Sequence, residues 1–157
     1  MVVLEQVDVD DVRFARLLQL YLHEWSAVVS VPIDEQARFD YEELPLYRDH
    51  EARAIQLVLG ASDRLPVGFA MISRDDAGCR HVEEFFVIAG ARRQGLGARA
   101  AAALFAAGAG RWTLTVRPEN PGGLAFWRRV VPGADERVEP GDDGVARTRL
   151  TFTMPPP

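Results

Sequence analysis

The feature that most constrains the fold of this 157-residue chain is an alanine-rich run at residues 98–107, which lies between two apolar segments. Alanine has the highest helix propensity, so this run predicts a helix that ends at Gly108 or Gly110. Residues 81–88 before it and residues 112–116 after it are typical of strands. A strand, a helix and a strand in this order imply a parallel crossover. The sequence therefore predicts a sheet with at least one parallel pair.

The N-terminal part predicts one strand and two helices. Residues 2–7 can form the first strand, and Asp10 with Asp11 offers an N-cap for the helix that follows. That helix carries an apolar stripe at helical spacing, formed by Phe14, Leu18, Tyr21, Trp25 and Val28. Pro32 ends the pattern, and residues 34–44 predict a second helical stretch before Pro45.

The remaining segments predict further strands and one more helix. Residues 54–59 and 66–73 are typical of strands, and turn-prone residues connect them to residues 81–88 as an antiparallel meander. A short helix at residues 123–131 and a last strand at residues 145–154 complete the chain. We therefore predict an α+β fold with one domain, residues 1–157, and a mixed, mostly antiparallel sheet of about six or seven strands with flanking helices.

The charged residues exclude several classes of protein. All 18 basic residues are arginine, which removes both Schiff-base chemistry on lysine and the phosphate-binding lysine of a P-loop. The net charge of −5 argues against general nucleic-acid binding, which needs a basic face. No apolar run is long enough to cross a membrane and the N-terminus shows no secretion signal, so we expect a cytoplasmic protein.

Cysteine and histidine give no expectation of a metal site. Cys79 is the only cysteine and lies in a turn-like stretch, so it predicts an ordinary loop thiol. The three histidines, His23, His50 and His81, have no ligand-like spacing. We therefore expect no bound metal.

The segment from Arg92 to Ala98 predicts an anion-binding loop. Gly95 and Gly97 permit a tight backbone path, and the first turn of the helix beyond them exposes unpaired amide groups. The helix dipole and three arginines, Arg92, Arg93 and Arg99, favour a negative ligand such as a pyrophosphate. Taken alone, the loop also fits a plain turn between a strand and a helix.

The neighbours of this loop are similar to the GNAT superfamily of acyl-CoA-dependent N-acetyltransferases. Arg92, Gly95 and Gly97 satisfy its loop signature. The resemblance extends back to the central strand, where Glu83 and Val87 occupy matching places, and forward to Asn120 and the aromatic helix with Phe126. It covers residues 81–131. Its implications are a GNAT-like fold and an acetyltransferase that uses acetyl-CoA as cosubstrate and a small-molecule or peptide amine as acceptor, with homodimers common among relatives.

The resemblance also implies a set of cofactor-binding residues. The backbone amides of the loop would hold the CoA pyrophosphate: Arg93, Gln94, Gly95, Leu96, Gly97 and Ala98. Val87 and Ile88 would pair with the pantetheine arm as an added strand, with one nearby amide directed at the thioester oxygen. Asn120 and Phe126 would line the other wall. Arg92, Arg93 or Arg128 would meet the 3′-phosphate.

A protonated alkyl amine must lose a proton before it can attack, so a general base is useful. Glu83 is the first candidate, because strand alternation would place it on one face with Phe85 and Val87. Glu84, expected on the opposite face, is the second, and a chain of water molecules is an alternative to both. The acidic residues of the segment 34–43 could attract a cationic acceptor, although a solvated helix face is the ordinary explanation for them.

The proton donor for the departing thiolate is less defined. Relatives often place a tyrosine where this chain has Trp127, which we expect to pack in the core. Tyr21, Tyr41 or Tyr47 could reach the site instead, or solvent could protonate a thiolate, whose parent thiol has a pKa of about 8.5.

Two other functions remain open from the sequence. The segment beginning at Gly95 also fits the dinucleotide-binding pattern of nucleotide-dependent oxidoreductases, but the antiparallel meander before it opposes a Rossmann fold. A non-catalytic acyl-CoA sensor or scaffold subunit would keep the loop without the chemistry. The identity of the acyl group also stays open.

Overall fold

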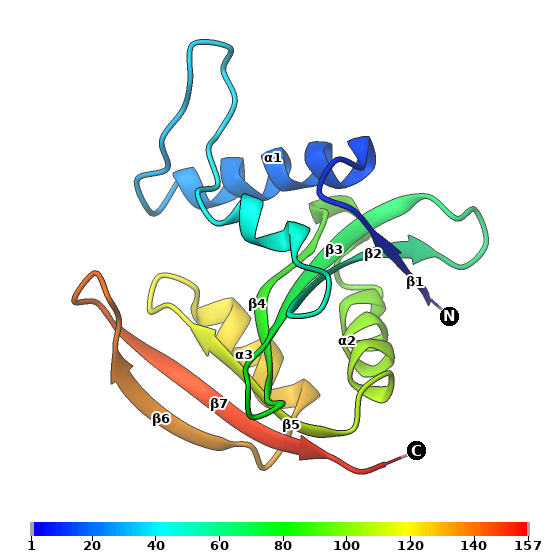
Figure 1. The fold of residues 1–157 in the computed structure, drawn as a ribbon, viewed down its shortest axis with the longest axis vertical. Helices are drawn as coiled ribbons and strands as arrows, with labels where there is room; N and C mark the ends of the chain where they lie inside the picture. Colours follow the sequence, from blue (N-terminus) through cyan, green and yellow to red (C-terminus); the bar gives the residue numbers. More distant parts are fainter. Residues whose placement is uncertain (1, 157) are drawn as a thin grey trace.

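A computed structural model describes residues 2–156 as an α+β fold built on one mixed sheet (Figure 1). Its seven strands are ordered β1-β2-β3-β4-β5-β7-β6. Their bounds are Val2–Val7 (β1), Arg53–Gly60 (β2), Pro66–Arg74 (β3), Arg80–Val87 (β4), Gly110–Val116 (β5), Asp135–Pro140 (β6) and Ala146–Met154 (β7). The helices are α1 (Val12–Ser26), α2 (Leu96–Ala106) and α3 (Pro121–Val130), with short 3₁₀ helices η1 (Leu44–Arg48) and η2 (Ala89–Ala91). Only β4 and β5 pair in parallel, so the predicted fold class is confirmed.

Helix α1 shows how local sequence sets an element. Its N-cap is Asp11, whose carboxylate accepts hydrogen bonds from the amides of Arg13 at 2.8 Å and Phe14 at 3.4 Å. Beyond the cap, the predicted apolar stripe places Phe14 and Leu18 in the core between α1 and the sheet. The cap and the stripe together fix where α1 begins and which face it buries.

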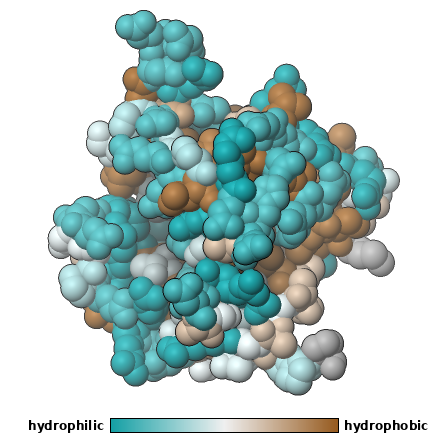
Figure 2. All heavy atoms as spheres, viewed as in Figure 1, coloured by the Kyte–Doolittle hydropathy of each residue, from teal (hydrophilic) through white to brown (hydrophobic). Residues whose placement is uncertain are grey.

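Two apolar cores cover the two faces of the sheet. On one face, α1 and η1 pack against β1 to β4, with Phe14, Leu57 and Phe69 fully buried. On the other face, α2 and α3 pack against β4, β5 and β7, with Trp112 and Leu150 at the centre. Hydrophilic atoms cover most of the surface in the space-filling view, with apolar atoms in separate patches (Figure 2).

The predicted helix at residues 34–44 is wrong. The Asp34 carboxylate accepts the amides of Gln36 and Arg38, both at 2.9 Å, which folds the chain into a turn instead. A bridge between Ile33 and Phe39 closes this turn, and the segment projects from the end of α1 as a cyan loop (Figure 1). Pro45 lies in the first turn of the 3₁₀ helix η1, which begins at Leu44, rather than ending a helix.

Strand β6 was not predicted because it lacks an apolar face. It is an edge strand with charged residues such as Glu136 and Arg137, and its pairing with β7 defines it rather than burial. Among residues 2–156, no helix combines the length and apolar character needed to span a membrane.

Strands β4 and β5 separate halfway along their length, and this separation positions the site. Their parallel pairing covers only Arg80–Val82 and Trp112–Leu114. Beyond it, β4 continues to Val87 and β5 to Val116 without pairing to each other. The unpaired edge of β4 is therefore open at the centre of the sheet.

Candidate active site

Two clefts meet where β4 and β5 separate. The first, of about 990 Å³, lies between β4, the Arg92–Ala98 loop and α3, and we call it the loop cleft. The second, of about 670 Å³, lies between α1, the 29–43 segment, β4, β5 and the turn between β6 and β7, and we call it the polar cleft. Both are lined by Tyr21, Trp25, Phe85, Asn120 and Trp127, so the two clefts adjoin at these side chains, and we call them together the groove.

The wall of the loop cleft offers a row of unpaired amides at the N-terminus of α2. Gly95 is the N-cap residue with φ 69°, a left-handed conformation that glycine adopts without strain, and no side chain caps the helix. The first helical bond runs from the Arg99 amide to the Gly95 carbonyl at 3.1 Å. Among the described residues, the amides from Arg93 to Ala98 have no protein acceptor. This arrangement fits a pyrophosphate, as the sequence predicts.

Gly97 brings the helix close to the opposite wall of the loop cleft. A Cβ atom at this position would lie 3.4 Å from the Phe126 ring and 3.9 Å from Cγ2 of Val87. Phe126 in turn stacks on Phe85, with ring centroids 5.9 Å apart. The passage between the α2 N-terminus and α3 is therefore narrow and apolar beside the amide row.

The arginines around the loop differ in whether they are bound to other parts of the protein. Arg92 donates from Nε to the Val87 carbonyl at 2.6 Å and from Nη2 to both Glu24 oxygens at 2.9 and 2.7 Å, so it ties the loop to α1. Arg128 is bound to Glu136 by two bonds of 2.8 Å. Arg93 and Arg129 line the loop cleft and form no ion pair within residues 2–156. A phosphate outside the amide row would meet Arg93 or Arg129 rather than Arg92 or Arg128.

The exposed edge of β4 presents Phe85 and Val87, not Ile88. The Ile88 amide donates to the Val67 carbonyl of the β3 chain at 2.9 Å, and its side chain packs on the α1 side of the sheet. Since backbone groups alternate along an antiparallel pair, the amides of Phe85 and Val87 point away from β3, toward the loop cleft. The predicted role of Ile88 in pairing with a ligand is not supported by this geometry, whereas that of Val87 is.

Most of the predicted cofactor residues do line the loop cleft: Val87, Arg92, Arg93, Gly95, Leu96, Gly97, Ala98, Asn120 and Phe126. Gln94 is not among them: its side chain donates to the Gly90 carbonyl at 3.5 Å, whereas its backbone amide belongs to the unpaired row at the start of α2. Asn120 is the N-cap of α3 and accepts the Gly123 amide at 2.9 Å, which leaves its Nδ2 free to donate into the groove.

Glu84 lines the polar cleft and lies between two tyrosines, of which Tyr21 also lines the loop cleft. The hydroxyl of Tyr21 donates to one of its oxygens and that of Tyr41 to the other at 3.0 Å. Burial is the largest influence and raises the pKa of Glu84 to about 7, although the two tyrosine bonds oppose the shift. The carboxylates of Glu83 and Glu43 act in the same direction as burial. This carboxyl group can therefore exchange a proton near neutral pH.

Both tyrosines stay protonated at neutral pH. Burial first, and then the charge of Glu84, raise the pKa of Tyr21 well above its usual value, and the same causes raise that of Tyr41. Tyr21 lines both clefts and Tyr41 only the polar cleft. The sequence showed Tyr21 only as part of an apolar stripe, and its hydroxyl was one of three that could reach the site.

Glu83 differs from its expected placement. A β-bulge between β3 and β4 pairs Met71 with Glu84 and Ile72 with Val82, which leaves Glu83 unpaired. The bulge turns the exposed Glu83 toward Ser73, whose hydroxyl donates to it. Both carboxylates line the polar cleft, so the expectation that they lie on opposite faces is wrong.

Trp127 packs in the core, as expected. It is 7 % exposed and contacts Phe85 and Phe126, with ring centroids 5.1 and 4.9 Å apart. Its ring forms part of the floor where the clefts meet, and its indole offers no proton for a leaving group at this position.

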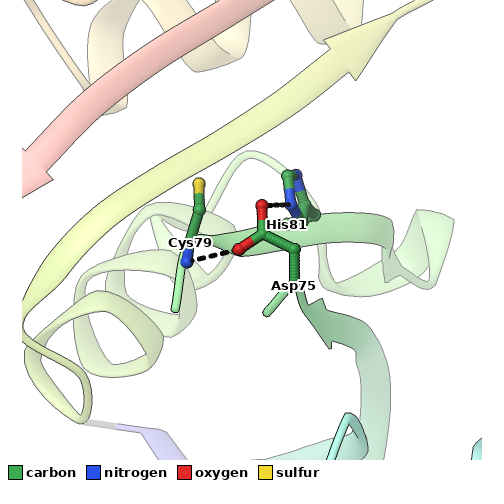
Figure 3. A group of neighbouring side chains, drawn as sticks. All are labelled: Asp75, Cys79 and His81. Carbon is green, nitrogen blue, oxygen red and sulfur yellow. Dashed lines mark hydrogen bonds and ion pairs between the residues drawn. The ribbon is translucent and has the colours of Figure 1, made fainter. Parts of the chain in front are cut away.

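The structure also brings together three side chains that the sequence did not connect. Asp75, Cys79 and His81 lie at the turn between β3 and β4, with their donor atoms within 4.8 Å of one another (Figure 3). The signal in the sequence was their spacing within one hairpin, which a comparison of the histidines alone does not reveal.

Comparisons with known proteins agree with this geometry. The sequence model of the acetyltransferase (GNAT) family matches residues 14–131, so the chain belongs to the GNAT family of acetyltransferases. It is therefore an acyltransferase, of a family that uses acetyl-CoA or another acyl-CoA as cosubstrate. No curated protein matches the sequence significantly.

Solved structures share the fold at low sequence identity. An acetyltransferase from Thermus thermophilus has a TM-score of 0.69 at 22% identity, covering 98% of this chain and 97% of that one. A GNAT-family acetyltransferase from Staphylococcus aureus Mu50 gives 0.70 at 13% identity, covering 98% and 99%. A chimera of the Vibrio cholerae spermidine N-acetyltransferase SpeG and hSSAT gives 0.67 at 14% identity, covering 97% and 95%. The alternative of a Rossmann-type oxidoreductase is excluded by this fold, which has a single parallel pair.

Proposed function

We propose that the protein transfers an acetyl group from acetyl-CoA to a primary amine by direct attack in a ternary complex, with Glu84 as the general base. The observation that carries this proposal is the position of Glu84 in the polar cleft, held by Tyr41 and by Tyr21, which also lines the loop cleft. Its pKa of about 7 suits a group that takes a proton from an amine at neutral pH. Glu83 remains the second candidate, because it lines the polar cleft but bonds to Ser73 and not to Tyr21.

The loop cleft would hold the donor. The amide row from Arg93 to Ala98 would bind the pyrophosphate, and Arg93 or Arg129 the remaining phosphate. The pantetheine arm would run along β4, between Phe126 and the amides of Phe85 and Val87. The Val87 amide would then donate to the thioester oxygen and stabilise the negative charge that develops on it.

The reaction would need a proton to be removed from the amine and a proton to be given to the departing thiolate. Glu84 removes a proton from the ammonium form of the acceptor, so the nitrogen lone pair can attack the thioester carbon. A carbon–nitrogen bond forms, the carbon–sulfur bond breaks, and the amide product keeps the acetyl group. The second proton of the attacking nitrogen passes to water as the intermediate collapses, and the thiolate takes up the proton that Glu84 removed.

Tyr21 would carry that proton between the clefts. Its own pKa lies too far above that of a thiol for it to act as a simple acid. Because Tyr21 bonds to Glu84 and lines both clefts, it can receive the proton of Glu84 as it gives its own to the thiolate. This relay supplies the donor that Trp127 cannot provide.

The polar cleft favours a cationic acceptor. Arg117, Arg147 and Arg149 line it, but each is paired with a carboxylate: Asp143 at 2.8 and 3.0 Å for the first two and Glu139 at 2.7 Å for the third. Glu43 and Asp142 also line it and form no ion pair within residues 2–156. The spermidine N-acetyltransferase chimera shares the fold, so polyamines are natural acceptors to test beside monoamines, amino acids and peptides.

The direct test is release of free thiol from acetyl-CoA with a panel of amines. We expect amine-dependent thiol release, faster with cationic acceptors such as diamines than with neutral amines of similar size. Acetyl-CoA binding without turnover on any amine would contradict the enzyme and favour a sensor. Turnover with propionyl-CoA or a longer acyl-CoA in preference to acetyl-CoA would overturn the acetyl assignment alone.

A further inference from the structure

The turn between β3 and β4 and the start of β4 bring together a carboxylate, a thiol and an imidazole, and the imidazole of His81 also lines the polar cleft. Oδ2 of Asp75 lies 3.3 Å from Nε2 of His81, and the Cys79 sulfur lies within 4.8 Å of both (Figure 3). Cys79 is 8 % exposed, whereas the side chains of Asp75 and His81 are 46% and 25% exposed. We propose that Asp75, Cys79 and His81 bind a divalent transition-metal ion of the zinc type.

The spacing of the donor atoms fits such an ion. Zinc bonds of about 2.0 to 2.1 Å to nitrogen and oxygen, at a tetrahedral angle, separate the two donors by about 3.3 Å. The Asp75 and His81 atoms already have this separation. A thiolate at about 2.3 Å from the metal would lie about 3.6 Å from each of them. The Cys79 sulfur lies within 4.8 Å of both atoms, so it has to move by only about 1 Å. The open side would leave the fourth position to water.

Backbone hydrogen bonds hold the ligands in place. The Asp75 amide donates to the Cys79 carbonyl at 3.0 Å, and the Cys79 amide donates to Oδ1 of Asp75 at 2.9 Å. Oδ1 is therefore engaged with the turn, while Oδ2 faces His81. One carboxylate oxygen stabilises the turn and the other is free to bind a metal.

The histidine has the outer partner that metal ligands usually have. Nδ1 of His81 lies 2.7 Å from the hydroxyl of Thr113, which is 4 % exposed on the neighbouring strand β5. The parallel register places His81 directly beside Thr113. When Nδ1 donates to this hydroxyl, the lone pair of Nε2 points toward Asp75, as in metal sites with a hydrogen-bonded second partner.

The mixture of donor atoms selects the kind of metal ion. Nitrogen, sulfur and oxygen donors together favour zinc-type ions over magnesium or calcium.

The single cysteine makes the test direct. Co²⁺ added alone to the untagged protein should give a thiolate charge-transfer absorption that saturates at one ion per chain, and Zn²⁺ should displace it. Zn²⁺ should also slow alkylation of the only thiol at least tenfold. Cys79→Ser should abolish the absorption, and Asp75→Asn, which keeps the turn, should weaken Zn²⁺ binding at least tenfold. Thr113→Val should weaken it about 10- to 100-fold through loss of the outer partner.

The matched control is His50→Gln. Nε2 of His50 lies 3.0 Å from Oδ1 of Asp8, so it forms a similar pair without a cysteine, and this variant should bind Zn²⁺ like the wild type. Thermal unfolding without metal checks that each variant is folded. If no thiolate absorption forms, or if Zn²⁺ binds equally well to Cys79→Ser, His81 and Asp75 form an ion pair only and the proposal is overturned.

Discussion

The buried position of Glu84 lowers the stability of the fold when the carboxyl group is charged, but it also gives this group a pKa suitable for the proposed proton transfer. Its burial disfavours the charged form, which raises its pKa to about 7, and two tyrosine hydroxyls only partly compensate. A neutral amide at this position would avoid the cost of burying a charge. The same burial gives the proposed base a pKa suited to an amine at neutral pH.

Glu84→Gln should raise the free energy of unfolding relative to wild type, and this gain should increase with pH. A folded pKa above the unfolded value of about 4.3 means that the contribution of Glu84 to stability is complete below pH 4.3 and is lost as pH rises through about 7. The loss is about 4 kcal/mol at most. The free energy of unfolding of the variant, relative to wild type, should therefore rise between pH 5 and pH 8. Urea unfolding at both pH values measures it, and a pH-independent difference would contradict the shifted pKa.

The two tyrosines bonded to Glu84 should be separable by substitution. Tyr21→Phe and Tyr41→Phe each remove a bond that lowers the pKa of Glu84, so both should move the acidic limb of the kcat/KM profile to higher pH. Of these two tyrosines, Tyr21 alone lines both clefts, so Tyr21→Phe should also lower the pH-independent kcat, by about 10- to 100-fold. Equal kcat values for the two variants would remove the proton relay from the mechanism.

At the scale of elements, the N-terminus of α2 and its glycine loop form the proposed donor site. This part was well predicted, because an alanine-rich run and two glycines specify a helix and its entry locally. The bulge at Glu83 was not predictable, since the strand itself carries no glycine or proline there and the bulge arises from its register with β3. The turn at Asp34 was misjudged because acidic and aromatic residues at helical spacing also suit an Asp-capped turn.

Gly97→Val tests the narrow passage at this helix. The added side chain would meet Phe126 and Val87 and occupy the space of the donor, so the KM for acetyl-CoA should rise about tenfold or more, with the melting temperature changed little. Gly90→Ala is the matched control, because a Cβ atom there meets nothing within 4 Å. A KM for acetyl-CoA unchanged by Gly97→Val would place the donor elsewhere.

At the scale of the molecule, the separation of β4 from β5 creates the groove. The chain order predicted a parallel crossover, and the structure adds that the pair stays together for only a short stretch. Beyond that stretch, β4 exposes a backbone edge to the loop cleft and the Glu84 side chain to the polar cleft. The meeting of Tyr21, Tyr41 and Glu84 was beyond sequence analysis, since these residues lie on three segments far apart in the chain.

The cytoplasmic location and the homodimer stay predictions. The net charge of −5 and the unpaired acids of the polar cleft point the same way for the acceptor, because both favour the approach of a cation. The proposed mechanism depends on removal of the amine proton by Glu84, whichever amine is the acceptor.

The most direct test is the pH dependence of kcat/KM for acetyl transfer in three proteins: wild type, Glu84→Gln and Glu83→Gln. We expect the wild-type rate to rise with pH through about 7, and Glu84→Gln to lose about 10²- to 10⁴-fold at pH 7 and to recover toward high pH as the amine loses its own proton. Glu83→Gln should keep the wild-type profile. A Glu84→Gln variant with the wild-type rate and profile, or a loss confined to Glu83→Gln, would contradict this account.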